Sequence, residues 1–377
     1  MKTKLHSLFL GLALLAGLDY ANAQVTNLGI AQAGGQSLLY WPTSTTTNYI
    51  LQSTTNLASP NWTTEEYPVP VEASTVSNTT PAKFFRLIYT NPPVGVGLIP
   101  AGPFLMGNSI GDSDITDANP TNVYVSAFFM DTNLVDLSVW QAVSTYATTF
   151  NGYSFDDAGL GKAANHPVQS VNWYDCVKWC NARSELAGLM PCYYTDAGFT
   201  QVYKTGDVDA VYVNWAAKGF RLPTEAEWEK AARGGLSGRR FPWGNLISEG
   251  QANYYGNTSD YSYDRGPNGY NSIGSIGGTS PATSPVGSFD VNGYGLYDMA
   301  GNVVEWCWDW YAAPPYPAGS PYLGGTNPTG AGPTSGVRVL RGGRWDTGAP
   351  GLRCAYRGND GPSYAGSIVG FRCLRGL

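Results

Sequence analysis

The fold of this chain is decided by residues 301–311, which read GNVVEWCWDWY. The tryptophans in this stretch recur at every second position, a period typical of a β-strand whose one face packs on a core. We therefore expect most of these rings to be core residues, although such aromatic rings also stack on sugars. Asp309 lies among them and is placed to orient an arginine such as Arg341 or Arg357, or simply to form a structural ion pair with it.

Further motifs lie on both sides of this stretch. Thr224 followed by Glu227 forms a capping box, which predicts the start of a helix, and Gly234 predicts its end. Trp228 is expected on the inward face of that helix. The motifs, in chain order, are GFRLPTEAEWEKAARGG at 219–235, FPWGN at 241–245, RVLRGG at 338–343 and GFRC at 370–373.

In this order the motifs resemble the formylglycine-generating enzyme (sulfatase-modifying factor) domain. The resemblance covers residues 97–377 and implies an α+β, C-type lectin-related fold that is rich in loops. Residues 98–107 (LIPAGPFLMG) are expected to form its opening strand. Asp136 and Asn172 are expected to cap helices that run to Tyr146 and to about Leu186.

The first 23 residues are typical of a secretory signal peptide. Lys2 and Lys4 precede an apolar segment at residues 8–18, and cleavage is expected after Ala23. That segment is too short to span a bilayer, which takes about 20 apolar residues, and no later segment approaches that length. We therefore expect a secreted or periplasmic protein without a transmembrane segment.

Residues 24–92 are expected to form a separate, small all-β sandwich that resembles a fibronectin type III module. Short aromatic and β-branched runs at 49–53 and 84–89 alternate with clusters of Thr, Ser, Asn and Pro. Trp41 and Trp62 are its predicted core residues. A linker at residues 93–96 would join this module to the larger domain.

Charge and histidine content exclude several classes of function. Cleavage of the signal peptide removes two lysines and one aspartate, which leaves 20 basic and 27 acidic residues and a net charge of −7. Such a chain is a poor partner for nucleic acid or anionic lipid. Of the two histidines only His166 remains, so a multi-histidine iron or zinc centre is excluded.

The resemblance implies a structural calcium ion at residues 298–305. Its ligands would be the side chains of Asp298 and Glu305 and the main-chain carbonyls of Gly301 and Val303. Two carboxylates that bracket a glycine, with carbonyls between them, suit calcium, which takes about 6–8 oxygen ligands. Alternatively, Glu305 only accepts backbone N–H groups in a tight turn.

A second calcium site is implied at the Asn253 side chain and the Tyr254 carbonyl. Its remaining ligands would come from the inserted segment at residues 255–278, where the candidates are Asn268, Asp260 and Asp264.

The resemblance also implies an oxidase, in which copper(I) between two thiolates serves to oxidise a substrate cysteine with oxygen. The first thiolate position is Thr347 here, and the second falls one residue off register, near Cys354. A hydroxyl cannot replace a thiolate on copper(I). Arg344 also replaces the small serine of the motif. The copper centre is therefore expected only under the alternative of a divergent oxidase, with Cys307 as the possible second thiol.

The six cysteines of an exported chain are expected to be disulfides or buried thiols rather than metal ligands. The resemblance implies a disulfide between Cys180 and Cys373. The pairing of the other four stays open: Cys176, Cys192, Cys307 and Cys354.

The function we predict is that of a calcium-stabilised scaffold whose surface loops bind a protein or a glycan. The expected binding loops are residues 195–213 and 255–278, because specificity usually resides in loops displayed on a rigid core. The alternatives are the divergent oxidase, acting on cysteine in exported sulfatases, and a structural adhesion protein that associates with itself. The sequence does not indicate the oligomeric state.

Overall fold

The computed structural model describes six strands between Gly29 and Thr90 and, beyond them, residues 95–274, 282–333 and 335–377. The chain divides into two compact units, Met1–Pro93 and Val94–Leu377. The predicted signal peptide and the predicted core residues Trp41 and Trp62 lie outside the described residues.

The first unit contains two antiparallel sheets of three strands, ordered β1-β2-β5 and β4-β3-β6. The predicted strands at 49–53 and 84–89 lie within β3 and β6, which pair along seven residues from Asn48↔Thr90 to Thr54↔Phe84. The sandwich packing and the fibronectin type III-like character of this unit stay predictions. The strands are β1 (Gly29–Ala33), β2 (Gln36–Tyr40), β3 (Asn48–Thr54), β4 (Thr63–Glu66), β5 (Ala73–Ser77) and β6 (Phe84–Thr90).

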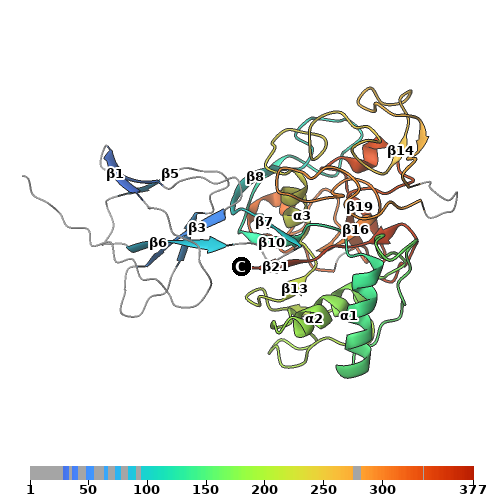
Figure 1. The fold of residues 1–377 in the computed structure, drawn as a ribbon, viewed down its shortest axis with the longest axis horizontal. Helices are drawn as coiled ribbons and strands as arrows, with labels where there is room; N and C mark the ends of the chain where they lie inside the picture. The colour runs from blue at the N-terminus through green and yellow to red at the C-terminus, as the bar shows by residue number, and fades with distance from the viewer. Residues whose placement is uncertain are drawn as a thin grey trace, which may run out of the picture. The chain divides into compact units, whose positions relative to one another are not determined.

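The second unit combines three helices with many short strands, which agrees with the predicted α+β class (Figure 1). Its helices are α1 (Leu137–Phe150), α2 (Trp173–Leu186) and α3 (Glu225–Ala232), with 3-10 turns η1 (Pro321–Leu323) and η2 (Ala349–Leu352). Its strands are β7 (Val96–Ile99), β8 (Gly102–Met106), β9 (Thr121–Val125), β10 (Phe128–Asp131), β11 (Tyr193–Tyr194), β12 (Tyr212–Val213), β13 (Phe220–Arg221), β14 (Tyr255–Gly256), β15 (Gly269–Tyr270), β16 (Val304–Trp310), β17 (Gly325–Thr326), β18 (Arg338–Arg341), β19 (Gly358–Asp360), β20 (Val369–Gly370) and β21 (Leu374–Gly376).

Among the described residues this unit has two two-stranded sheets, β11-β12 and β14-β15, and three larger ones. The first has the order β13-β21-β10-β7, so β21 lies between strands from much earlier in the chain. The second, β19-β18-β16-β20, contains the tryptophan-rich strand β16. The third, β17-β9-β8, has β8 at its edge. In Figure 1, α1 and α2 lie together on one side of the unit, away from the β14 hairpin.

Two sequence predictions need correction. The expected opening strand at 98–107 is two strands, β7 and β8, separated at Pro100-Ala101, where proline supplies no N–H for a ladder. The helix capped by Asp136 does not end at Tyr146 but continues to Phe150. No helix-breaking residue occurs before Asn151 and Gly152, and Gly152 has a φ of 71°.

The other helix predictions are confirmed. Asn172 caps α2, which runs to Leu186. The Thr224 hydroxyl accepts from the Glu227 N–H, and the Glu227 carboxylate accepts from the Thr224 N–H, which completes the capping box of α3. The inward-facing Trp228 is fully buried.

The alternation in β16 produces two chemically different faces. Trp306 is fully buried and Trp308 half-buried, and both pack in the cluster that contains Trp173 of α2. The guanidinium of Arg338 lies 3.6 Å from the ring centre of Trp173 and 3.5 Å from that of Trp310. The opposite face of β16, with Cys307, packs in the cluster around α3.

In the part of the chain that the structure describes, no helix combines the length and the apolar character needed to cross a membrane.

Candidate functional site

Thr347 and Cys354 lie in a loop that follows β18 and contains η2 (Ala349–Leu352). This loop turns sharply at Gly343, which has a φ of 72°. A Cβ at that position would lie 2.8 Å from a main-chain oxygen of η2. This close approach requires glycine at position 343. Thr347 precedes the 3-10 turn in the chain and Cys354 follows it.

Thr347 lies half-buried beside the inserted segment. Its carbonyl accepts a hydrogen bond of 3.0 Å from the Tyr255 N–H. Its methyl group packs against Gly351, where a Cβ would lie 2.3 Å from Thr347 Cγ2. The position that the resemblance assigns to the first thiolate therefore carries a hydroxyl next to β14.

Cys354 is buried, with 1% of its surface exposed, and belongs to the apolar cluster around Trp228. Burial raises the pKa of its thiol to about 11, although the Arg233 guanidinium opposes this shift. Cys307 is also fully buried in that cluster, and burial raises the pKa of its thiol well above the usual value. Without a metal both residues are therefore protonated thiols at neutral pH, and copper(I) would have to displace their protons to bind.

Aromatic side chains gather around Thr347. The rings of Tyr255 and Tyr270 meet edge to face at 4.9 Å, and the rings of Tyr270 and Trp345 lie 5.8 Å apart. The Tyr356 ring lies near Gly351, where a Cβ would lie 4.0 Å from Tyr356 Cε1 and 2.3 Å from Thr347 Cγ2. We call these five residues the Thr347 surface: Tyr255, Tyr270, Trp345, Thr347 and Tyr356.

The Thr347 surface presents both apolar rings and polar groups. Tyr255, Tyr270 and Tyr356 are 39%, 53% and 38% exposed. The Trp345 indole N–H is buried without a hydrogen-bond partner. Sequence reasoning placed Tyr255 and Tyr270 in a binding loop but missed Trp345 and Tyr356, because it considered residues 341–357 only as a copper motif.

A network of buried charges lies beneath this loop. Arg341 forms an ion pair with Glu229 of α3, and both side chains are fully buried. Arg233 reaches the other oxygen of Glu229 at 2.7 Å. Arg357 pairs with Glu225 of α3 at 2.6 Å. Two arginines from the loop region are thus fixed to one helix.

Asp309 does not orient Arg341 or Arg357, contrary to the sequence prediction. Its Oδ2 accepts a 2.7 Å hydrogen bond from the Glu225 N–H at the start of α3, and its Oδ1 is buried without a partner. Burial and the nearby Glu225 carboxylate raise the pKa of Asp309 to about 8. The arginines instead pair with the two glutamates of α3, which leaves Asp309 to cap the helix.

The Glu305 carboxylate accepts hydrogen bonds from side chains that neither sequence prediction named. Arg372 donates to both carboxylate oxygens, at 2.8 and 2.9 Å, and the Trp228 indole donates at 2.9 Å. All of these groups are buried. The carboxylate is therefore neutralised by an arginine and does not act as an acceptor for a tight turn.

Among the residues that the structure describes, Asp298 and Asn253 each retain a buried oxygen without a hydrogen-bond partner. Asp298 Oδ2 accepts from the Gly287 N–H at 2.8 Å, but Oδ1 accepts nothing. Asn253 Nδ2 donates to the Ala282 carbonyl at 2.8 Å, whereas its Oδ1 is also unpartnered. Burial raises the pKa of Asp298 to about 6. Such orphaned oxygens are typical sites for a water or a cation.

The two segments with predicted calcium ligands lie against each other. Asn253 and Gly301 form a parallel bridge. The Asn302 N–H donates to the Asn253 carbonyl at 2.8 Å. A Cβ at Gly301 would lie 2.3 Å from that carbonyl oxygen, so only glycine allows this approach. Tyr254 and Val303 follow directly in the two segments and are both buried.

The other candidates for the second calcium site are engaged in local turns. Asp264 accepts from the Tyr254 hydroxyl and from the N–H groups of Asn257 and Gly266. Asp260 accepts from the Asn257 side chain, and Asn268 accepts from Thr258. Residues 275–278 of the inserted segment lie outside the described residues.

Cys180 and Cys373 lie with their sulfur atoms 3.3 Å apart, and both are fully buried. The structure thus brings the two residues together, and their disulfide stays a prediction. Cys176 and Cys192 belong to the same apolar cluster. His166 is buried and faces the Thr283 hydroxyl at 3.0 Å, and burial lowers its pKa.

Residues 89–377 match the family model described as the sulfatase-modifying factor enzyme 1-like domain. The formylglycine-generating enzyme of Streptomyces coelicolor is 32% identical over 301 residues, which cover 73% of this chain and 87% of that enzyme. The chaperone protein LppX of Paenibacillus barcinonensis is 32% identical over 249 residues, covering 58% of this chain and 82% of that protein. Serine/threonine-protein kinase pkn1 of Chlamydia caviae is 41% identical over 167 residues, 44% of this chain but only 22% of the kinase.

Solved structures show the same fold. Treponema denticola variable protein 1 superposes with a TM-score of 0.56 at 28% identity, over 83% of this chain and 99% of that one. PvdO from Pseudomonas aeruginosa superposes with a TM-score of 0.52 at 23% identity, over 75% of this chain and 94% of that one.

Replacing Arg372 tests the buried pair with Glu305. We expect Arg372→Met to lower the free energy of unfolding by about 3–5 kcal/mol, because it leaves a buried carboxylate without its cation. The matched change Arg344→Met removes an arginine whose pair with Asp346 is partly exposed and should cost at most about 1 kcal/mol. Urea unfolding of both variants measures the difference. A similar, small loss for both would show that Arg372 is not what neutralises Glu305.

Proposed function

The chain belongs to the sulfatase-modifying factor enzyme 1-like domain family, and we propose that within this family it is an exported binding protein rather than an oxidase. The observation that carries the proposal is the pair of groups at the family's copper position. Thr347 offers a hydroxyl, which is no ligand for copper(I), and Cys354 is a buried thiol whose pKa is raised to about 11.

The names of the similar proteins indicate that proteins with different functions share sequence similarity with this chain. They include a formylglycine-generating enzyme, a chaperone and a protein kinase. Membership in the family therefore does not by itself make this chain an oxidase. Its activity depends on the residues present at the site.

The Thr347 surface is the binding site that we propose. Partly exposed tyrosines supply apolar area at low entropic cost, and their hydroxyls supply hydrogen bonds, a combination typical of surfaces that bind proteins or glycans. Trp345 is 7% exposed and supports the Tyr270 ring from below rather than meeting a ligand itself. The Thr347 surface also lies at the position of the family's copper site. In this chain the same location would bind a ligand instead of carrying out the oxidation.

Calcium is the cofactor that we propose for stability. One ion would be held by Asp298 with the carbonyls of Gly301 and Val303, and a second by Asn253 with the carbonyl of Tyr254, because calcium accepts carboxylate, amide and main-chain oxygens. The unpartnered buried oxygens of Asp298 and Asn253 support this assignment. Glu305 fits less well as a ligand, because Arg372 and Trp228 donate to its oxygens.

Oxidase activity is the first property to test. The mature protein, loaded with copper(I), is incubated in air with a sulfatase-type Cys-x-Pro-x-Arg peptide, and aldehyde formation is followed by mass spectrometry. We expect no turnover beside an active formylglycine-generating enzyme. Turnover that disappears in Cys354→Ser would overturn the proposal and show that a second thiolate reaches the site.

Ligand binding is tested on glycan and protein arrays with three single variants. Tyr270→Ala removes the most exposed ring of the Thr347 surface, Tyr212→Ala removes a 45% exposed ring from the other predicted loop, and Phe150→Ala is an exposed control at the end of α1. We expect Tyr270→Ala to weaken the binding of a ligand by about tenfold or more, equivalent to about 1.4 kcal/mol. Loss of binding in Tyr212→Ala alone would place the site on residues 195–213 instead.

Calcium binding is tested by thermal unfolding with calcium and with a chelator. At a concentration of about 100 times Kd, calcium should stabilise the fold by about 2.7 kcal/mol, a rise of roughly 5–10 °C in Tm. Asp298→Ala, which removes the oxygen ligand, should abolish most of this rise, whereas Asp290→Ala, at an exposed neighbour, should retain it. Equal unfolding temperatures in calcium and chelator would refute the calcium site.

A further inference from the structure

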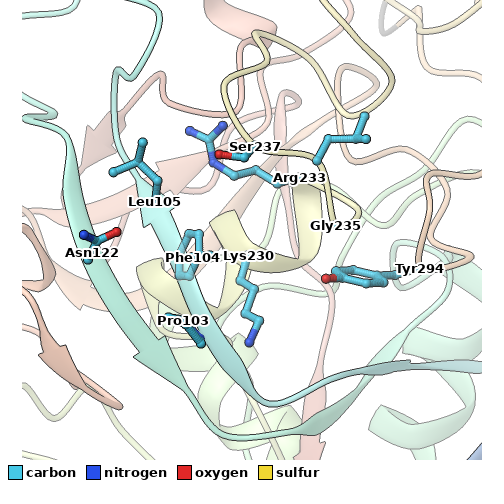
Figure 2. Close-up of a pocket in the computed structure, with 10 residues that line it drawn as sticks. Pro103, Phe104, Leu105, Asn122, Lys230, Arg233, Gly235, Ser237 and Tyr294 are labelled. Atoms are coloured by element: carbon cyan, nitrogen blue, oxygen red, sulfur yellow. The ribbon is translucent and has the colours of Figure 1, made fainter. Parts of the chain in front are cut away.

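A cleft of about 470 Å³ lies between β8, the end of α3 and the loop that follows this helix. Figure 2 shows Phe104 in the middle of the cleft, with Tyr294 and Gly235 on one side and Leu105 on the other. The walls are mainly apolar, and the volume is in the range of small-molecule sites. Its lining residues are Pro103, Phe104, Leu105, Asn122, Lys230, Arg233, Gly235, Leu236, Ser237 and Tyr294.

The cleft contains a buried cation without a counter-ion. Lys230 is 4% exposed, and its Nζ donates to the carbonyls of Gly102 and Val125 at 2.8 and 3.2 Å. Two of the three N–H groups of the ammonium are thus used, and the third has no partner among the described residues. Within the described ranges, no carboxylate oxygen lies within 4.0 Å of Nζ.

Other charges at the cleft do not compensate Lys230. The Arg233 guanidinium, which also lines the cleft, is already paired with Glu229 at 2.7 Å. Burial alone lowers the pKa of Lys230, to about 8, with no carboxylate acting against it. Lys178 provides a contrast, because this other buried lysine has Asp175 at 2.8 Å. A buried ammonium normally has such a partner, and in the cleft an anion would supply it.

Groups around the cleft complete a site for an amphipathic anion. In Figure 2, the Lys230 side chain runs beside Phe104, and its Nζ lies at the Pro103 end. The Tyr294 hydroxyl points toward Lys230 and Phe104 from the opposite side. Phe104, Leu236 and Tyr294 provide apolar surface for the body of a ligand.

From this arrangement we infer that the cleft binds a small carboxylic acid with an apolar body, whose carboxylate pairs with Lys230 and whose body packs on Phe104 and Leu236. This site is separate from the Thr347 surface and does not depend on the function proposed for that surface. A carboxylate provides the missing counter-ion, and the apolar walls favour an alkyl or aromatic body over a free inorganic anion.

Isothermal titration with sodium decanoate tests this inference on the mature protein, with decan-1-ol as the uncharged ligand of the same chain length. We expect one decanoate to bind per chain, about tenfold or more tighter than decan-1-ol. Lys230→Met keeps the apolar stem and should weaken decanoate by a similar factor, while circular dichroism and Tm report whether the variant folds.

A second pair of variants decides the result even if Lys230→Met does not fold. Leu236 and Leu246 are exposed leucines, 41% and 46%, and only Leu236 lines the cleft. Leu236→Glu places a negative charge at the cleft and should abolish decanoate binding, whereas Leu246→Glu should leave it unchanged. The inference is overturned if decanoate at about 1 mM does not bind, if decan-1-ol binds equally well, or if both leucine variants behave alike.

Discussion

Three buried carboxylates determine how the larger unit is assembled. A carboxylate withdrawn from water is stable only where a cation and hydrogen bonds replace its hydration. Each of the three has an arginine partner from a distant segment, in addition to the local Arg233 in the case of Glu229, so neutralising the charges also fixes the tertiary structure. The pairs join α3 and β16 to the C-terminal segment: Glu225 with Arg357, Glu229 with Arg341, and Glu305 with Arg372.

These ion pairs also bear on the proposal that this chain keeps the family's fold without its copper chemistry. Arg341 and Arg357 flank the loop that carries Thr347 and Cys354, and both are fixed to α3. The loop between them is therefore held at its two ends, and its intervening side chains contribute little to the ion pairs beneath. A copper ligand can be exchanged for a hydroxyl there, and tyrosines can gather around it, while the scaffold stays the same.

Interactions between residues close in the sequence could be predicted, and those between distant segments could not. The capping box of α3 involves residues three positions apart, and the two faces of β16 follow from a period of two, so both were predictable. The partner of Glu305 could not be predicted, because Arg372 lies 67 residues away. The motif at 370–373, which contains Arg372, was used only for the resemblance and to locate Cys373. The Thr347 surface likewise combines Tyr270 and Tyr356 from distant segments of the chain, and no local pattern indicates that they belong together.

The position of β21 sets an order for the biogenesis of this protein. This strand, Leu374–Gly376, pairs with β10 on one side and with β13 on the other, and Arg372 lies two residues before it. While the chain emerges from the ribosome, β10 therefore lacks one neighbour and Glu305 lacks its cation until these residues have been synthesised. Until then the edges of β10 and β13 that β21 covers are unpaired, and such edges are recognised by chaperones and proteases.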